Sequence, residues 1–228
     1  NVRTLFPQPG ETEPWNTSSY FNDYNRDKKS LTLDLAEPRG RALFLELVAR
    51  CDCVIENYRA DVLDKLGIDR PVLVGHSDGG SIALIHAGGA GRNVAGLILM
   101  APHVFVEDIS IASIAQAKVT FETTELAQKL GKYHRDPVKT FRGWNDIWLH
   151  PDFRAWNIEE YLPRVTCPVL AIQGADDEYG TPAQVEAIRK QVKGEVEVLM
   201  LADCRHSPHK DQPQATLEAM AGFIERIG

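Results

Sequence analysis

The sequence predicts a doubly wound α/β protein, in which helices cover both faces of a mostly parallel sheet of six strands. Short apolar runs alternate with helical patterns along most of the chain. The runs are continuously apolar, as is typical of strands that are buried on both faces of a sheet. Such an alternation implies right-handed crossovers between parallel strands. The composition agrees, because 43% of the 228 residues are hydrophobic and 25% are charged.

The N-terminal third predicts two strands and two helices. Residues 1–29 are rich in Pro, Asn, Asp and Ser, which predicts an extended arm. A strand is expected over residues 30–35, followed by a helix that begins at Pro38, where the first turn tolerates proline. A second strand is expected over residues 53–55. Apolar residues at helical spacing then predict a helix over residues 62–66.

The rest of the chain predicts four further strands and a closing helix. The strands are expected at residues 72–74, 94–100, 169–173 and 196–201. The closing helix is expected over residues 217–227. With the first two strands in place, the order of the six would be near 2-1-3-4-5-6. The interval 103–166 has no strand pattern and is rich in aromatic residues, so we expect a helical cap over a ligand site there.

The strongest chemical motif lies at residues 75–79, Gly-His-Ser-Asp-Gly, which fits the pattern G-x-S-x-G. An apolar run precedes it and a helical pattern follows it, which is the strand–turn–helix context that the motif needs. The glycines allow a sharp turn that raises the Ser77 hydroxyl above the sheet edge. We predict Ser77 as a nucleophile. The N–H of Asp78 is predicted to donate to a developing oxyanion.

A serine hydroxyl needs a base to take its proton and an acid to orient that base. His206 follows the run that ends at Leu201. It is predicted as the base in preference to His209, because it lies nearer the strand end. Asp176 and Asp177 both follow the fifth predicted strand. The order Ser, Asp, His along the chain is compatible with either aspartate as the acid.

These motifs give residues 70–228 a resemblance to the C-terminal two-thirds of an α/β-hydrolase-fold enzyme with a helical cap. The stretches that carry it are residues 74–80, 97–102, 168–174 and 204–209. The resemblance implies a serine hydrolase. In that family the acid stands three residues after the glycine at the strand end, which places it on Asp177 here.

The N-terminal third lacks the leading hairpin and the His-Gly loop of a complete α/β-hydrolase. Residues 20–68 instead resemble the class III, formyl-CoA transferase-like CoA-transferases, through residues 25–35, 40–44 and 54–59. We therefore interpret the chain as a fusion. Its expected parts are a CoA-transferase-like segment that completes the sheet (1–69), a hydrolase core (70–102 and 167–228) and a cap (103–166).

The fusion has a consequence for the oxyanion site. The hydrolase resemblance implies a second backbone donor from the loop after the first predicted strand, which is Ala36 here. Pro38 has no N–H, and Glu37 adds negative charge to this loop. We therefore expect weak acyl-enzyme hydrolysis of a small-molecule ester. The alternatives are a CoA-binding or acyl-CoA thioesterase module and an inactive chimeric fold.

Partners and location are also predicted. The net charge of −7 argues against a nucleic-acid partner, which selects clustered Lys and Arg. We expect no membrane segment, because no apolar run reaches about 18 residues. Neither a metal nor a cofactor is expected. The cysteines are interpreted as reduced thiols and the N-terminus lacks a signal-peptide core, so a cytoplasmic location is expected. An exposed sheet edge predicts a homodimer.

Overall fold

The computed structural model describes residues 29, 31–51, 54, 68, 70–89, 93–131, 134 and 136–228. The chain divides into two compact units. Unit 1 comprises Asn1–Thr32 and Ile114–Phe153, and unit 2 comprises Leu33–Ser113 and Arg154–Gly228. Unit 2 contains the residues that the sequence singles out for chemistry.

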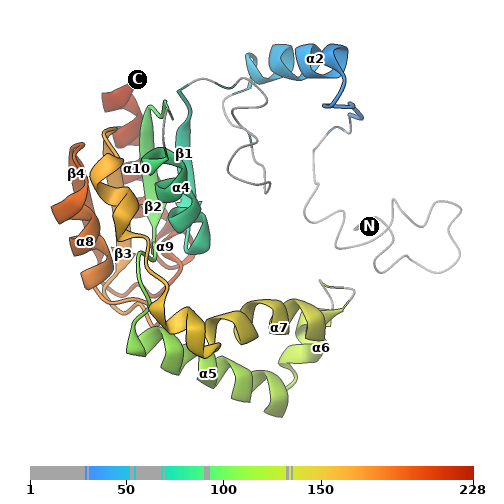
Figure 1. Ribbon diagram of the computed structural model, residues 1–228, viewed down its shortest axis with the longest axis vertical. Coiled ribbons are helices and arrows are strands. Elements are labelled where there is room, and N and C mark those ends of the chain that lie inside the picture. Colours follow the sequence, from blue (N-terminus) through green and yellow to red (C-terminus); the bar gives the residue numbers. More distant parts are fainter. Residues whose placement is uncertain are drawn as a thin grey trace, which may run out of the picture. The chain divides into compact units, whose positions relative to one another are not determined.

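Unit 2 is built on a parallel sheet of four strands (Figure 1). The strands are β1 (Val72–His76), β2 (Gly96–Met100), β3 (Val169–Gly174) and β4 (Val196–Leu201), in the spatial order β1-β2-β3-β4. Every residue of β2 and β3 is buried. The continuously apolar runs are therefore the central strands of the sheet, as the sequence predicts.

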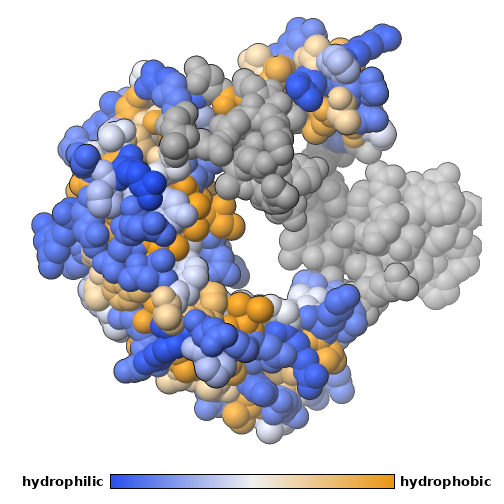
Figure 2. Space-filling model, viewed as in Figure 1, coloured by the Kyte–Doolittle hydropathy of each residue, from blue (hydrophilic) through white to orange (hydrophobic). Residues whose placement is uncertain are grey.

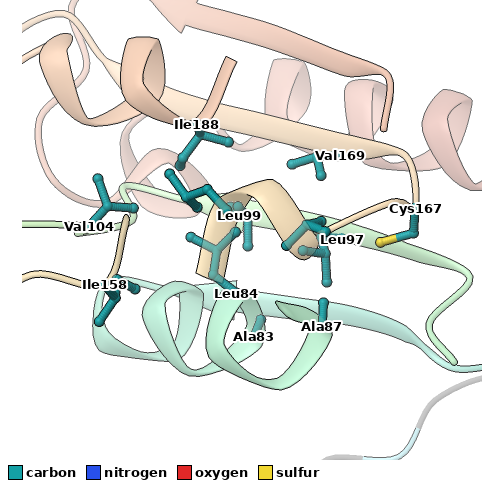
Figure 3. Close-up of a cluster of buried hydrophobic side chains, with 12 residues drawn as sticks. Ala83, Leu84, Ala87, Leu97, Leu99, Val104, Ile158, Cys167, Val169 and Ile188 are labelled. Carbon is teal, nitrogen blue, oxygen red and sulfur yellow. The ribbon is translucent and has the colours of Figure 1, made fainter. Parts of the chain in front are cut away.

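Helices cover both faces of this sheet (Figure 1). They are α4 (Asp78–Gly88), η4 (Glu159–Arg164), α8 (Ala183–Gln191), α9 (Pro208–Asp211) and α10 (Pro213–Ile227). On one face, Leu97 and Leu99 of β2 join a buried cluster with Leu84 of α4 (Figure 3). On the other face, Ile98 joins a cluster with Phe223 of α10. Alternate side chains of one strand thus serve two cores, which is the doubly wound arrangement.

Unit 1 contains helices and a small aromatic core. Besides η4, the described helices of the cap interval are α5 (Asp108–Thr123), which begins in unit 2, α6 (Leu126–Gly131), α7 (Pro137–Trp148) and η3 (Pro151–Ala155), which ends in unit 2. Phe121 stacks on Phe141 with ring centroids 4.0 Å apart. The buried Asn145 amide donates to the Ile114 carbonyl at 2.9 Å. The interval predicted as a helical cap, 103–166, is therefore largely helical where it is described, and its role as a cap stays a prediction.

The predicted strand over residues 30–35 is wrong for the residues that are described. Residues 31–34 form no strand, and a turn follows them. Asp34 makes that turn, because its Oδ1 accepts the Ala36 N–H at 2.9 Å and its carbonyl accepts the Glu37 N–H at 3.3 Å. An aspartate that binds its own backbone two residues on competes with strand pairing. The predicted helix is confirmed as α2 (Pro38–Val48).

The sheet accordingly has four strands among the described residues rather than six, and these are the last four of the predicted order. The second predicted strand, 53–55, lies outside the described residues except for Val54, and the predicted helix over 62–66 lies outside them entirely. No residue of α2 is buried. Figure 2 shows both apolar and polar residues on its surface. None of the described helices has the length and apolar character that crossing a bilayer requires.

Candidate active site

Ser77 occupies a strained turn between β1 and α4. Its backbone has φ 55° and ψ −120°, and its N–H donates to the Met100 carbonyl at 2.9 Å. A positive φ is rare for a residue with a side chain and marks functional turns. The turn is so tight that a Cβ on Gly75 would lie 2.2 Å from the Gly79 carbonyl oxygen. Glycine at 75 is therefore required for the turn to close.

His206 connects Ser77 to Asp177 by hydrogen bonds. It lies in the loop between β4 and α9, with Nε2 2.9 Å from Ser77 Oγ and Nδ1 2.9 Å from Asp177 Oδ1. A carboxylate only accepts, so Nδ1 carries the proton and the Nε2 lone pair faces the serine hydroxyl. His209 lies in α9 instead, against the ring of His76 at 4.9 Å between centroids. Of the two candidate bases, His206 is the one that reaches Ser77.

Asp177 lies in the loop after β3 and accepts hydrogen bonds from three donors. Besides His206, the Tyr179 N–H donates to Oδ1 at 2.9 Å and Gln173 Nε2 donates to Oδ2 at 3.3 Å. Burial alone would raise the pKa of this carboxyl, but the hydrogen bond and charge of His206 and the Tyr179 N–H bring the pKa below its ordinary value. Asp176 is exposed. The structure therefore places Asp177, and not its neighbour, against the imidazole.

The loops that carry the acid and the base lie against each other. The Asp176 N–H donates to the Cys204 carbonyl at 2.9 Å. A Cβ on Gly174, at the end of β3, would lie 2.1 Å from that carbonyl oxygen and 2.3 Å from the one of Arg205. Only glycine allows this approach. The glycine at the strand end thus fixes the distance between the acid loop and the base loop.

A buried polar network holds the far side of the acid loop. The Glu107 carboxylate, just before α5, accepts the Thr181 N–H at 2.9 Å, the Thr181 hydroxyl at 2.5 Å and Gln184 Nε2 at 2.7 Å. In the first turn of α5, the Ser110 hydroxyl donates to the Tyr179 carbonyl at 2.5 Å. The sequence analysis missed these residues. The feature that marks them is a polar side chain at a buried position, such as Gln184, whose exposed fraction is 0%.

His103 is a second imidazole of the site and is 2% exposed. Its ring centroid lies 5.6 Å from that of His206. Burial, followed by the positive charge of His206, lowers the pKa of His103 to about 4, against the opposing charges of Asp177 and Glu107. His103 is therefore neutral at pH 7, and the folded protein keeps an uncharged imidazole beside the base.

The buried His103 should make the protein less stable as the pH falls from 6.5 to 4. In that range the unfolded chain binds a proton that the folded chain excludes, so acid favours unfolding. The shift from 6.5 to about 4 corresponds to a loss of about 3 kcal/mol in the free energy of unfolding. Urea unfolding across this range should show a shallower pH dependence for His103→Gln. The exposed His209→Gln serves as control, and an unchanged slope in His103→Gln would contradict the assignment.

The two predicted oxyanion donors differ in their surroundings. Asp78 is the first residue of α4, where an N–H has no acceptor within its own helix. The Ala36 N–H is engaged by the Asp34 carboxylate. The role of the Ala36 N–H as an oxyanion donor stays a prediction. In the described part of the chain, no three His, Cys, Asp or Glu residues are grouped as metal ligands would be.

Two family models match the chain. The model described as "Serine aminopeptidase, S33" matches residues 44–213, and that of CoA-transferase family III matches residues 2–76. An acyl-CoA transferase of Fusarium pseudograminearum is 38% identical over 69 residues, which are 28% of this chain and 15% of that protein. A formyl-CoA:oxalate CoA-transferase of Bradyrhizobium sp. (strain ORS 278) is 42% identical over 50 residues, 22% and 12% of the two chains. The chain thus spans about 15% or less of the length of these relatives.

Solved structures show the same fold over about three quarters of the chain. VinJ is 23% identical, with a TM-score of 0.54, and the match covers 74% of this chain and 70% of VinJ. The enol-lactonase of Burkholderia xenovorans LB400 is 19% identical, with a TM-score of 0.50 and 74% coverage of both chains. These likenesses show an α/β-hydrolase fold. Because one family model covers most of the residues, the chain belongs to the serine aminopeptidase S33 family of α/β-hydrolases, and it carries a segment of CoA-transferase family III at its N-terminal side.

Proposed function

We propose that the protein is a serine hydrolase that cleaves a carboxylic ester through an acyl-enzyme on Ser77. The observation that carries the proposal is the continuous hydrogen-bonded chain from Ser77 Oγ through His206 to Asp177, with both contacts at 2.9 Å. The strained backbone of Ser77 supports it, because such strain persists at sites where it serves a function. Membership of a hydrolase family supports it further.

In the first half of the reaction, Ser77 Oγ attacks the ester carbonyl carbon and His206 Nε2 takes the hydroxyl proton. Asp177 stabilises the imidazolium that forms. The bond between the carbonyl carbon and the alcohol oxygen then breaks, and His206 gives its proton to the leaving alkoxide. The products of this step are the free alcohol and an acyl group bound to Ser77.

In the second half, water attacks the acyl carbon and gives a proton to His206. The bond to Ser77 Oγ breaks, and the proton returns to the serine as the carboxylic acid leaves. The Asp78 N–H is the donor that we assign to the oxyanion in both halves. A single donor in place of two costs roughly 3–4 kcal/mol in the transition state. We therefore propose turnover of activated esters rather than of amides.

Two measurements on the wild-type protein test the proposal. The protein should release p-nitrophenolate from p-nitrophenyl acetate above the rate of buffer alone. A fluorophosphonate should modify it once, and mass spectrometry should place the adduct on the peptide that contains Ser77. Neither release nor an adduct would contradict the proposed chemistry, whereas an adduct elsewhere would contradict the assignment of the nucleophile.

A second candidate is hydrolysis of an acyl-CoA thioester by the same residues. The match to CoA-transferase family III over residues 2–76 favours it, since the matching relatives are named for acyl-CoA and formyl-CoA transfer. A higher kcat/KM for acetyl-CoA than for p-nitrophenyl acetate, together with a rise in Tm on adding CoA, would favour this candidate. The absence of both effects would leave the ester as the substrate class.

A further inference from the structure

The backbone of His206 is held at both of its polar groups. His76 Nε2 lies 2.7 Å from the His206 carbonyl oxygen, and the Glu178 carboxylate accepts the His206 N–H at 3.2 Å. Both partners are neighbours of the residues that the His206 side chain contacts. His76 precedes Ser77, and Glu178 follows Asp177. The nucleophile turn and the acid loop therefore each supply one additional side chain that contacts the base.

The contact of His76 with a carbonyl oxygen shows which ring nitrogen carries the hydrogen. A carbonyl oxygen only accepts, so His76 Nε2 carries the hydrogen and donates it. Partial burial lowers the pKa of His76. The hydrogen bond to the His206 carbonyl opposes this effect, but the positive charges of His206, His209 and Lys210 add to it, and the pKa lies below its ordinary value. A neutral donor fixes the carbonyl without placing a second positive charge beside the imidazolium that forms during turnover.

The remainder of the base loop is held in a similar way. The Arg205 N–H donates to Asp211 Oδ2 at 2.9 Å, and Glu178 forms an ion pair with the Arg205 side chain at 3.2 Å. The side chain of His206 itself is 15% exposed, so packing surrounds most of its ring. Tyr179 covers one side at 4.8 Å between ring centroids. Backbone hydrogen bonds therefore add to side-chain packing in setting the orientation of the imidazole.

We propose that His76 and Glu178 are positioning residues, which hold the His206 backbone so that its imidazole stays in line between Ser77 and Asp177. The inference rests on the proposed function. Both residues act through the backbone of His206, although the His76 ring also lies 5.2 Å from the His206 ring between centroids. A misplacement of about 1 Å at a reacting group reduces turnover by roughly 10²-fold. Loss of either hydrogen bond should therefore lower kcat and leave KM nearly unchanged.

The test compares variants that remove each hydrogen bond with variants that keep it. His76→Leu and Glu178→Ala should lower kcat for p-nitrophenyl acetate by roughly 10- to 100-fold. His76→Gln keeps a donor near the position of Nε2, and Glu178→Gln keeps an acceptor for the His206 N–H. Both should stay within about 3-fold of wild type, since their hydrogen bonds are retained. His209→Leu is the matched control, because it removes an imidazole that packs against the His76 ring and leaves the hydrogen bond of His76 to the His206 carbonyl in place.

A second readout does not depend on turnover. The proton on His206 Nδ1, shared with Asp177, should give a downfield NMR resonance in Ser77→Ala, which has no nucleophile. That resonance should broaden or shift when His76→Leu is added and should persist with His76→Gln. An unchanged resonance and kcat in His76→Leu, or an equal loss in His76→Gln, would overturn the proposal. A resonance that responds as expected in a protein without esterase activity would instead reject the proposed function alone.

Discussion

Ester hydrolysis by the Ser77→Ala variant should fall at least about 10³-fold, because the acyl-enzyme can no longer form. The substitution removes one oxygen and leaves the contact of His206 with Asp177 in place. The backbone turn should also survive, since the Ser77 N–H and not its side chain binds Met100. The loss should therefore appear in kcat with little change in the Tm.

The measurement is p-nitrophenyl acetate hydrolysis by purified wild type and Ser77→Ala, corrected for buffer. Ser207→Ala is the control, because this serine follows the base and makes no side-chain cap to α9. It should hydrolyse the ester at nearly the wild-type rate. Equal rates in wild type and Ser77→Ala would mean that the observed hydrolysis does not pass through Ser77.

The Asp177→Asn variant should lose roughly 10³- to 10⁴-fold in kcat. Three donors converge on this side chain, from His206, Tyr179 and Gln173. A carboxylate accepts all three, but an amide offers one oxygen, so its NH₂ group faces either Gln173 or both His206 and the Tyr179 N–H. If the NH₂ faces His206, the imidazole must carry its proton on Nε2, where it can no longer accept the Ser77 hydroxyl proton.

Asp176→Asn provides a matched control for this prediction. Asp176 is exposed, and the contact that it makes with the base loop is through its backbone N–H, which the substitution keeps. The variant should retain nearly full kcat in the same assay. Similar losses in the two variants would indicate a general effect of charge at the loop, and would contradict the assignment of Asp177 as the group that orients His206.

The central strands of the hydrolase part could be predicted because they are buried on both faces. The apolar run at β3, all of whose residues are buried, was located to within one residue. The predicted strand over residues 30–35 failed for a local reason. Its alternating leucines continue past Asp34, but the Asp34 side chain binds the Ala36 N–H and turns the chain. Strand propensity depends only on the type of each residue, whereas the turn depends on one hydrogen bond of the Asp34 side chain.

The site could be predicted only in part. Gly75 carries its own signal, because a Cβ there would lie 2.2 Å from the Gly79 carbonyl oxygen, which no other residue avoids. Residue order alone could not separate Asp177 from Asp176, since the difference is burial and not chemistry. His76 occupies a variable position of the motif, so nothing in the pattern indicates its contact with His206. Gln173 was more accessible to prediction, because the NH₂ group of a glutamine inside a fully buried strand needs acceptors, which Asp177 and two carbonyls provide.

The placement of the three reacting side chains also bears on how such a protein could change over time. Ser77, Asp177 and His206 follow β1, β3 and β4, whereas the long insertion leaves the core after β2. Residues 114–153 of that insertion belong to the other compact unit. Recombination could therefore exchange this segment for one from a relative without cutting any loop that bears a reacting group. The insertion and the reacting groups are therefore encoded on separate stretches of the gene, so selection can alter one while it preserves the other.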